Sequence, residues 1–161
     1  MMVRSERHGD ATTIASIITQ AFGRADEARL VARLRADGTA AISLVAVFGG
    51  DLVGHVMLSP MSAPFPALGL APLSVLPIHQ CMGIGTALVE AGLKQAKEQG
   101  WDGVFVLGDP HYYERFGFCA SLARGFSSPY AGPHFMALSL GGDLPATIGE
   151  VFYASTFGDL V

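Results

Sequence analysis

The run VLPIHQCMGIGTALVEA, residues 75–91, constrains the fold of this chain more than any other stretch. It follows an apolar segment with strand character, residues 68–75, and Pro77 cannot donate a ladder hydrogen bond, so the strand ends there. A turn containing Gly83 and Gly85 then opens a long helical pattern. A strand, a glycine turn and a helix start leave unpaired backbone N–H groups where the helix dipole also favours an anion. The sequence therefore predicts a phosphate-binding turn.

Two nucleotide-binding motifs do not fit this turn. A dinucleotide fingerprint needs a third small residue where Leu88 stands. A P-loop needs a Gly-Lys pair, and the chain has none. The pattern that remains is Q-x-x-G-x-G directly after L-x-V-x-P.

That remaining pattern resembles the acetyl-CoA motif of the GNAT N-acetyltransferase superfamily. The resemblance implies that backbone amides of the turn hold the CoA pyrophosphate, and glycines without a Cβ allow its oxygens to approach closely. Cys81 and Met82 stand where many members carry Gly and a basic residue, which removes a side-chain charge but keeps the backbone donors. The cofactor-binding residues implied by the resemblance are Leu73, Ser74, Val75, Gln80, Cys81, Met82, Gly83, Ile84, Gly85 and Thr86.

A second motif follows one helix and one apolar strand later. Residues 107–118 read LGDPHYYERFGF, and the last six residues match the family pattern Y-x-x-x-G-F. The variant is similar to the YhbS-like branch of the superfamily. The resemblance implies that Tyr113 is catalytic, because a phenol can donate a proton or hydrogen bond to the departing thiolate. Tyr112 is expected to pack or to lie on the surface.

Length and composition indicate one domain of 161 residues. The net charge of -4 and the lack of a basic cluster argue against nucleic-acid binding. Hydrophobic residues make up 50% of the chain, and one hypothesis is that part of this surplus is buried in a homodimer.

Cysteine, histidine and hydropathy patterns narrow the setting. Cys81 and Cys119 form no C-x-x-C and are interpreted as free thiols of a reducing compartment. The histidines show no metal-ligand spacing, so no metal is expected. No apolar run reaches the ~18 residues of a membrane helix, and the N-terminus lacks a signal-peptide core. These features predict a cytoplasmic protein that does not bind a membrane.

The expected elements form an α/β fold with a mixed sheet. The resemblance implies the GNAT fold, in which mostly antiparallel strands are flanked by helices and two central strands splay apart around the cofactor. Asp10 is expected to cap the first helix, and residues 60–66 to form a loop. Strands are predicted at 3–7, 41–48, 52–59, 68–75, 103–108, 118–120, 135–140 and 150–154, and helices at 10–22, 27–36, 83–99 and 110–116.

The implied reaction is direct transfer from acetyl-CoA to a primary amine of a small molecule or protein in a ternary complex. Many relatives carry an acidic general base, but residues 52–80 contain no acid, which leaves His55, His111 or water. Asp109 is expected to cap a helix. The acceptor is expected to contact the loops at 63–68 and 124–134, where Ser127, Ser128 and Tyr130 lie, and the tail from 141 to 161 is expected to pack beside it. The alternative is a CoA-binding sensor that has lost catalysis.

Overall fold

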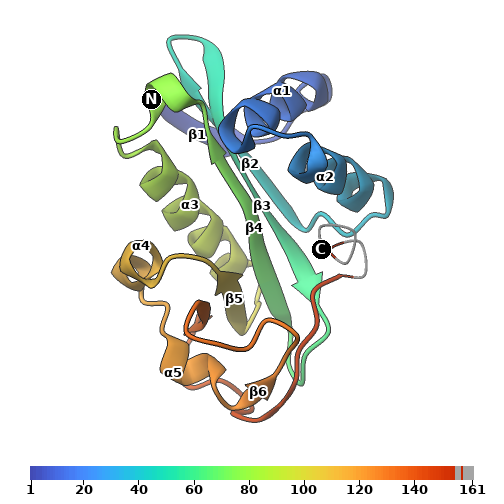
Figure 1. The fold of residues 1–161 in the computed structure, drawn as a ribbon, viewed down its shortest axis with the longest axis vertical. Coiled ribbons are helices and arrows are strands. Elements are labelled where there is room, and N and C mark those ends of the chain that lie inside the picture. Colours follow the sequence, from blue (N-terminus) through green and yellow to red (C-terminus); the bar gives the residue numbers. More distant parts are fainter. Residues whose placement is uncertain (155–156, 158–161) are drawn as a thin grey trace.

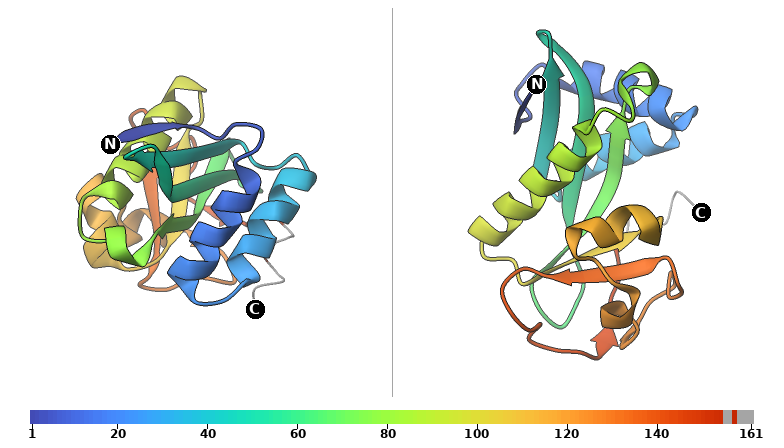
Figure 2. Two further views of the ribbon diagram at one scale, coloured as in Figure 1. Left: turned by 90° about the horizontal axis from the view of Figure 1, so that it is seen from above. Right: turned by 90° about the vertical axis from the view of Figure 1, so that its left-hand side faces the viewer.

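The computed structural model describes residues 1–154 and 157. A six-stranded sheet in the order β1-β2-β3-β4-β5-β7 separates α1 and α2 on one face from α3 on the other (Figures 1 and 2). The strands of this sheet are β1 (Met2–Ser5), β2 (Ile42–Phe48), β3 (Asp51–Met61), β4 (Ala67–Val75), β5 (Gly103–Leu107) and β7 (Phe135–Ser139). The strands β6 (Phe126–Ser127) and β8 (Gly149–Glu150) pair separately. The helices are α1 (Ala11–Phe22), α2 (Asp26–Ala36), α3 (Ile84–Glu98), α4 (Pro110–Tyr113) and α5 (Ala120–Ala123), with 3₁₀ turns η1 (Pro77–His79) and η2 (Glu114–Phe116).

Strands β1 to β4 form an antiparallel meander, whereas β4 and β5 are parallel. The parallel pair is short, because β4 meets β5 only from Ala67 to Gly69. Beyond Gly69, β4 pairs with β3 alone among the described residues, so the two central strands diverge (Figure 1). The prediction of a mixed, mostly antiparallel sheet with splayed central strands is confirmed.

A bulge in β4 accompanies this divergence. The β3 interval from Val56 to Leu58 lies opposite the longer β4 interval from Leu70 to Leu73, so β4 carries one extra residue. Ala71 packs toward α1 and α2, and Leu73 toward α3, although strand residues two apart normally share a face. A bulge bends the strand and increases its twist. It thereby turns Leu73 and Val75 toward the gap.

An apolar stripe of α3 packs against the sheet. Ile84, Leu88, Val89, Gly92 and Ala96 are buried against β2, β3 and β4. The contact is close because a Cβ at Gly92 would lie 3.0 Å from a methyl of Leu58. On the other face, the buried isoleucines and leucines of α1 and α2 cover β3 and β4.

Four expectations about local structure are wrong. Asp10 adopts helical dihedrals and does not cap α1, because its carboxylate accepts from the Arg7 N–H at 2.7 Å and from Arg4. Residues 118–120 form no strand: Cys119 makes one bridge to Ala137 and α5 begins at the next residue.

The other two concern prolines and the tail. The strand β3 continues through Pro60 to Met61, because β2 pairs only as far as Leu58 and the missing N–H faces no partner strand. The predicted strand at 150–154 is reduced to the two residues of β8 and a bridge between Ser62 and Phe152.

Candidate active site

A cleft of about 670 Å³ lies where β4 ends and α3 begins, opposite α4 and η2. The two sequence motifs meet across it although a whole helix and a strand separate them in the chain. Its lining residues are Leu73, Val75, His79, Gln80, Cys81, Gly83, Ile84, Gly85, Thr86, Asp109, Tyr112, Tyr113 and Arg115.

All but two of the predicted cofactor-binding residues line this cleft. Ser74 does not, because successive strand side chains alternate and its side chain is buried on the opposite face, beside its register partner His55. Met82 does not either, and 54% of its surface is exposed. The predicted catalytic residue Tyr113 lies in the cleft with the others.

The turn presents a row of free backbone donors. Within the described part of the chain, no N–H group from Cys81 to Thr86 donates to another backbone group, and the first bond of α3 runs from the Ala87 N–H to the Gly83 carbonyl at 3.1 Å. The Gln80 side chain ties the turn to the strand, because its Nε2 donates to the Val75 carbonyl at 3.1 Å. The turn is thus held open at the helix N-terminus, where both the free donors and the dipole favour an anion.

Two residues with left-handed backbone conformation shape the turn before α3. Gly83 has φ 81° and Cys81 has φ 63°, and Cys81 is the non-glycine residue with positive φ among those described. An L-residue in this region costs roughly 1–2 kcal/mol. The chain therefore stores strain at the position where many members of the family have glycine.

Tyr112 belongs to the cleft wall and is not a surface residue. A Cβ at Gly85 would lie 2.7 Å from the Tyr112 hydroxyl, so this glycine gives α4 room to approach the first turn of α3. Tyr112 packs as expected, against the rings of Tyr113 and Phe116, but its place in the cleft wall was not predicted, because nothing local distinguishes two neighbouring tyrosines.

Tyr113 is half-buried in an aromatic cluster. Its ring centroid is 5.0 Å from that of Tyr112 and 5.8 Å from that of Phe118. Burial, with a smaller contribution from Tyr112, raises the pKa of Tyr113 to about 12. The phenol therefore stays protonated at neutral pH and can donate. Asp109 caps α4 as predicted, since its Oδ1 accepts from the His111 N–H at 3.0 Å.

Arg115 brings a positive charge into the cleft that the motif at residues 80–85 lacks. Its Nη2 donates to Thr86 Oγ1 at 3.2 Å and its Nε to the Tyr112 carbonyl at 3.1 Å. The guanidinium also lies 4.5 Å from the Tyr112 ring centroid. Sequence reasoning did not single out Arg115; the available signal was a basic residue inside the second motif.

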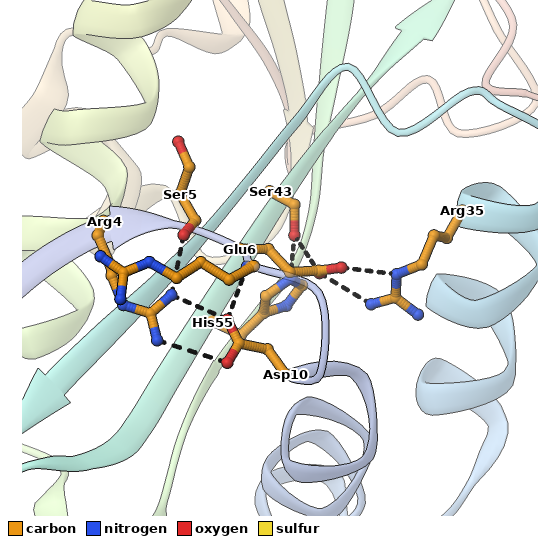
Figure 3. Close-up of polar contacts among 8 residues, drawn as sticks. Arg4, Ser5, Glu6, Asp10, Arg35, Ser43 and His55 are labelled. Carbon is orange, nitrogen blue, oxygen red and sulfur yellow. Dashed lines mark hydrogen bonds and ion pairs between the residues drawn. The ribbon is translucent and has the colours of Figure 1, made fainter.

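His55 lies outside the cleft, in a buried polar network on the other side of the sheet (Figure 3). Its Nε2 is 2.8 Å from Ser43 Oγ, which also bonds Glu6, and Arg35 donates twice to the Glu6 carboxylate. Burial lowers the pKa of His55 to about 4. His111 is exposed and does not line the cleft either.

Within residues 1–154 and 157, no group of three or more His, Cys, Asp or Glu side chains is placed to hold a metal ion. None of the helices in that part of the chain has the length and apolarity needed to cross a membrane.

Comparison with known proteins identifies close relatives. The profile of the acetyltransferase (GNAT) family matches residues 11–118. The uncharacterized N-acetyltransferase YjhQ of Escherichia coli K12 is 40% identical over 134 residues, which cover 77% of this chain and 73% of YjhQ. The uncharacterized N-acetyltransferase YhbS of the same strain is 38% identical over 122 residues, covering 73% of each chain.

Two solved structures are similar over nearly the whole chain. E. coli YhbS in complex with CoA has a TM-score of 0.91 at 32% identity, covering 98% of this chain and 91% of that one. A GNAT family acetyltransferase from Brucella melitensis in complex with acetyl-CoA has a TM-score of 0.82 at 35% identity, covering 97% of both. The architecture expected from the two sequence motifs is confirmed.

Proposed function

Because the chain belongs to the GNAT acetyltransferase family, we propose that it transfers an acetyl group from acetyl-CoA to a primary amine of a small molecule or protein. The transfer is direct and takes place in a ternary complex. One observation carries the proposal: the unpaired N–H groups from Cys81 to Thr86 share a cleft with the protonated phenol of Tyr113. The solved relatives with CoA and acetyl-CoA support the choice of cosubstrate.

The turn and Arg115 together would bind the pyrophosphate. The backbone N–H groups at the N-terminus of α3 would orient the pyrophosphate, and the Arg115 guanidinium, which donates to Thr86, would supply a full positive charge. Arg115 thus compensates for the absence of a basic side chain at Cys81 and Met82. This compensation argues against the alternative of a sensor domain with a weakened phosphate site.

The free edge of β4 suits the pantetheine arm. Its residues beyond Gly69 have no partner strand on the β5 side in the described part of the chain, so this edge can take an added strand up to Val75, whose carbonyl already accepts from Gln80. Leu73 and Val75 line the cleft along this edge. The thioester would then lie in the gap between β4 and β5, with its carbonyl near a backbone N–H.

Acetyl transfer forms a C–N bond and breaks the C–S bond. The amine nitrogen attacks the thioester carbonyl, and the Tyr113 hydroxyl donates to the sulfur as the thiolate departs. Holding both reactants in the gap supplies much of the rate gain. The nitrogen gives its proton to water, because the His55 ring is buried and bonded to Ser43, and His111 is exposed outside the cleft.

The proposal is tested with a panel of primary amines, acetyl-CoA and a thiol-sensitive dye. We expect thiol release with at least one amine, and an acetylated product by mass spectrometry. Tight CoA binding without release for any amine would instead favour the sensor.

A matched pair of variants tests the site itself. Gly85→Val places a side chain against the Tyr112 hydroxyl, and we expect it to weaken acetyl-CoA binding at least tenfold, about 1.4 kcal/mol or more. Gly141→Val is the control, since a Cβ at Gly141 meets nothing within 4 Å. Equal affinities of the two variants for acetyl-CoA would show that the cofactor does not bind in this cleft.

The setting of the protein is also a proposal. The two free cysteines support a reducing compartment, and we place the protein in the cytoplasm. The homodimer stays a prediction, which a light-scattering mass at micromolar concentration decides.

A further inference from the structure

Tyr153 lies at the narrow end of the gap between the two central strands. The last residue of β4 that pairs with β5 is Gly69, and a Cβ there would lie 2.6 Å from Cε1 of the Tyr153 ring. The ring therefore lies directly over the backbone where the strands begin to separate. A side chain at position 69 and the ring of Tyr153 exclude each other.

The hydroxyl of Tyr153 is buried without a partner. The ring as a whole is half-buried, but its hydroxyl oxygen has no solvent contact and no hydrogen bond within the described residues. Burying a hydroxyl unpaired costs about 1–3 kcal/mol, and buried polar groups are normally hydrogen-bonded. A ligand with a polar group at the gap would supply that partner.

Tyr153 and Tyr113 flank the gap from opposite faces. Tyr113 packs with the core beneath α3, whereas Tyr153 packs with the core beneath α1 and α2, where its ring centroid is 5.0 Å from that of Phe157, and with the cluster that contains Phe105. In Figure 1, the segment that carries Tyr153 runs past the end of β3 on the side of α2, away from α3 and α4, and Phe152 bridges Ser62 directly after β3.

Electrostatics fit this placement. Burial raises the pKa of Tyr153 above its usual value, and Tyr130 and Tyr113 raise it further. The hydroxyl stays neutral at physiological pH, so it offers one donor and two acceptor lone pairs but not a base.

We propose that the Tyr153 hydroxyl is the hydrogen-bond partner of the acceptor amine, on the face of the gap opposite the cofactor cleft. This proposal rests on the acetyltransferase function. The cofactor occupies the α3 face, so a nucleophile reaches the thioester carbonyl from the other face, where Tyr153 lies. The phenol oxygen accepts one N–H of the amine and directs the nitrogen lone pair at the carbonyl. The edge-on contact with Tyr130, at a centroid distance of 5.5 Å, connects this position with the predicted acceptor loop.

Fluorine NMR of the protein labelled with 3-fluorotyrosine tests the placement, because the chain has four tyrosines. Single Tyr→Phe variants assign the signals. We expect CoA to shift the signals of Tyr112 and Tyr113, and acetyl-CoA to shift Tyr153 relative to CoA, since the two ligands differ only at the gap. A Tyr153 signal that is the same with both ligands overturns the proposal, while the responses of Tyr112 and Tyr113 independently test the cofactor cleft.

Kinetics of Tyr153→Phe test the role. The variant keeps the ring and loses only a buried, unpaired hydroxyl, so we expect a melting temperature no lower than that of the wild type and an unchanged KM for acetyl-CoA. The KM for the best amine of the panel should rise roughly tenfold, the effect of one lost hydrogen bond in a buried site. Tyr130→Phe removes the neighbouring phenol and is the comparison for a general effect on the aromatic cluster.

The outcomes separate the two proposals. A wild-type protein that acetylates no amine rejects the acetyltransferase function and the role of Tyr153 with it. A wild-type protein that turns over, with Tyr153→Phe retaining the wild-type amine KM or raising both KM values equally, rejects only Tyr153.

Discussion

The two faces of the sheet differ in how their polar groups are assembled. On the α3 face, the cleft takes its donors from consecutive backbone positions, Cys81 to Thr86, and its side chains from one further motif. On the α1 and α2 face, the polar groups come from segments far apart in the chain: Glu6, Arg35, Ser43 and His55 in one network and Tyr153 over Gly69.

This difference agrees with the roles proposed for the two faces, cofactor binding on the α3 face and acceptor binding on the α1 and α2 face. A diphosphate is common to every reaction with CoA, and a short turn at a helix N-terminus suffices to bind it. An acceptor differs from enzyme to enzyme, so its contacts come from loops and tails attached to a constant scaffold. The buried network beside them holds α2 to the end of β1, since Arg35 pairs with Glu6 at 2.8 Å.

The largest effect is expected on kcat when Tyr113 in the cofactor cleft is substituted. Tyr113→Phe removes the hydroxyl proposed to donate to the departing thiolate and should lower kcat by roughly a hundred- to a thousandfold, within the usual contribution of a positioned acid. The affinity for CoA, measured by calorimetry, should stay the same because the phosphate donors are untouched. An unchanged kcat would leave Tyr113 with a packing role only.

Acid is expected to lower the stability of the protein through the polar network of His55 and Glu6 on the α1 and α2 face. The folded pKa of His55 is lowered to about 4 from 6.5, so the unfolded chain binds the proton first and stability falls as pH drops through this window. The full loss is about 3 kcal/mol at 1.36 kcal/mol per pKa unit. The lowered pKa of Glu6, whose partners Arg35 and Ser43 outweigh its burial, adds a further loss as its carboxylate protonates in the fold.

Urea denaturation of the wild type and of His55→Gln between pH 7 and pH 4 measures this dependence. The variant has no imidazole to titrate, so its free energy of unfolding should vary less with pH. Parallel curves for the two proteins would show that His55 does not control the acid sensitivity.

Substitution of Arg115 tests the proposed phosphate contact in the cofactor cleft. Arg115→Gln should raise the Kd for CoA about tenfold, as expected for losing a charge-assisted contact to phosphate, and should reduce the salt dependence of binding. Arg115→Lys keeps the charge and should recover part of the affinity. A Kd of Arg115→Gln equal to that of the wild type at low salt would exclude a phosphate contact.

The smallest expected effect concerns the strained turn. Cys81→Gly should stabilise the protein by about 1 kcal/mol or less, because relief of the left-handed strain is partly offset by the flexibility of glycine in the unfolded chain. Cys119 has φ -143°, so Cys119→Gly should destabilise it. Melting temperatures that fall in both variants would show that the Cys81 side chain makes a stabilising contact.

Local signals were reliable where one element decides its own structure. The apolar spacing of α3, the Asp109 cap and the break of β4 at Pro77 were all predicted, because each depends on residues within a few positions. The Asp10 cap was wrong because Arg4 and the Arg7 N–H compete for its carboxylate. His55 was predicted as a candidate base, but in the structure β3 places it in a buried position on the face of the sheet opposite the cleft.

The sequence by itself determined the family, the glycine turn at the start of α3 and the tyrosine motif on the other side of the cleft, since each is encoded in a contiguous motif with its own backbone requirement. Only the tertiary structure decided that Arg115 supplies the charge missing from the turn and that the C-terminal segment places Tyr153 over Gly69. The physical reason is distance along the chain: these contacts join residues from separate elements, and no local propensity specifies which side chains meet when the sheet folds.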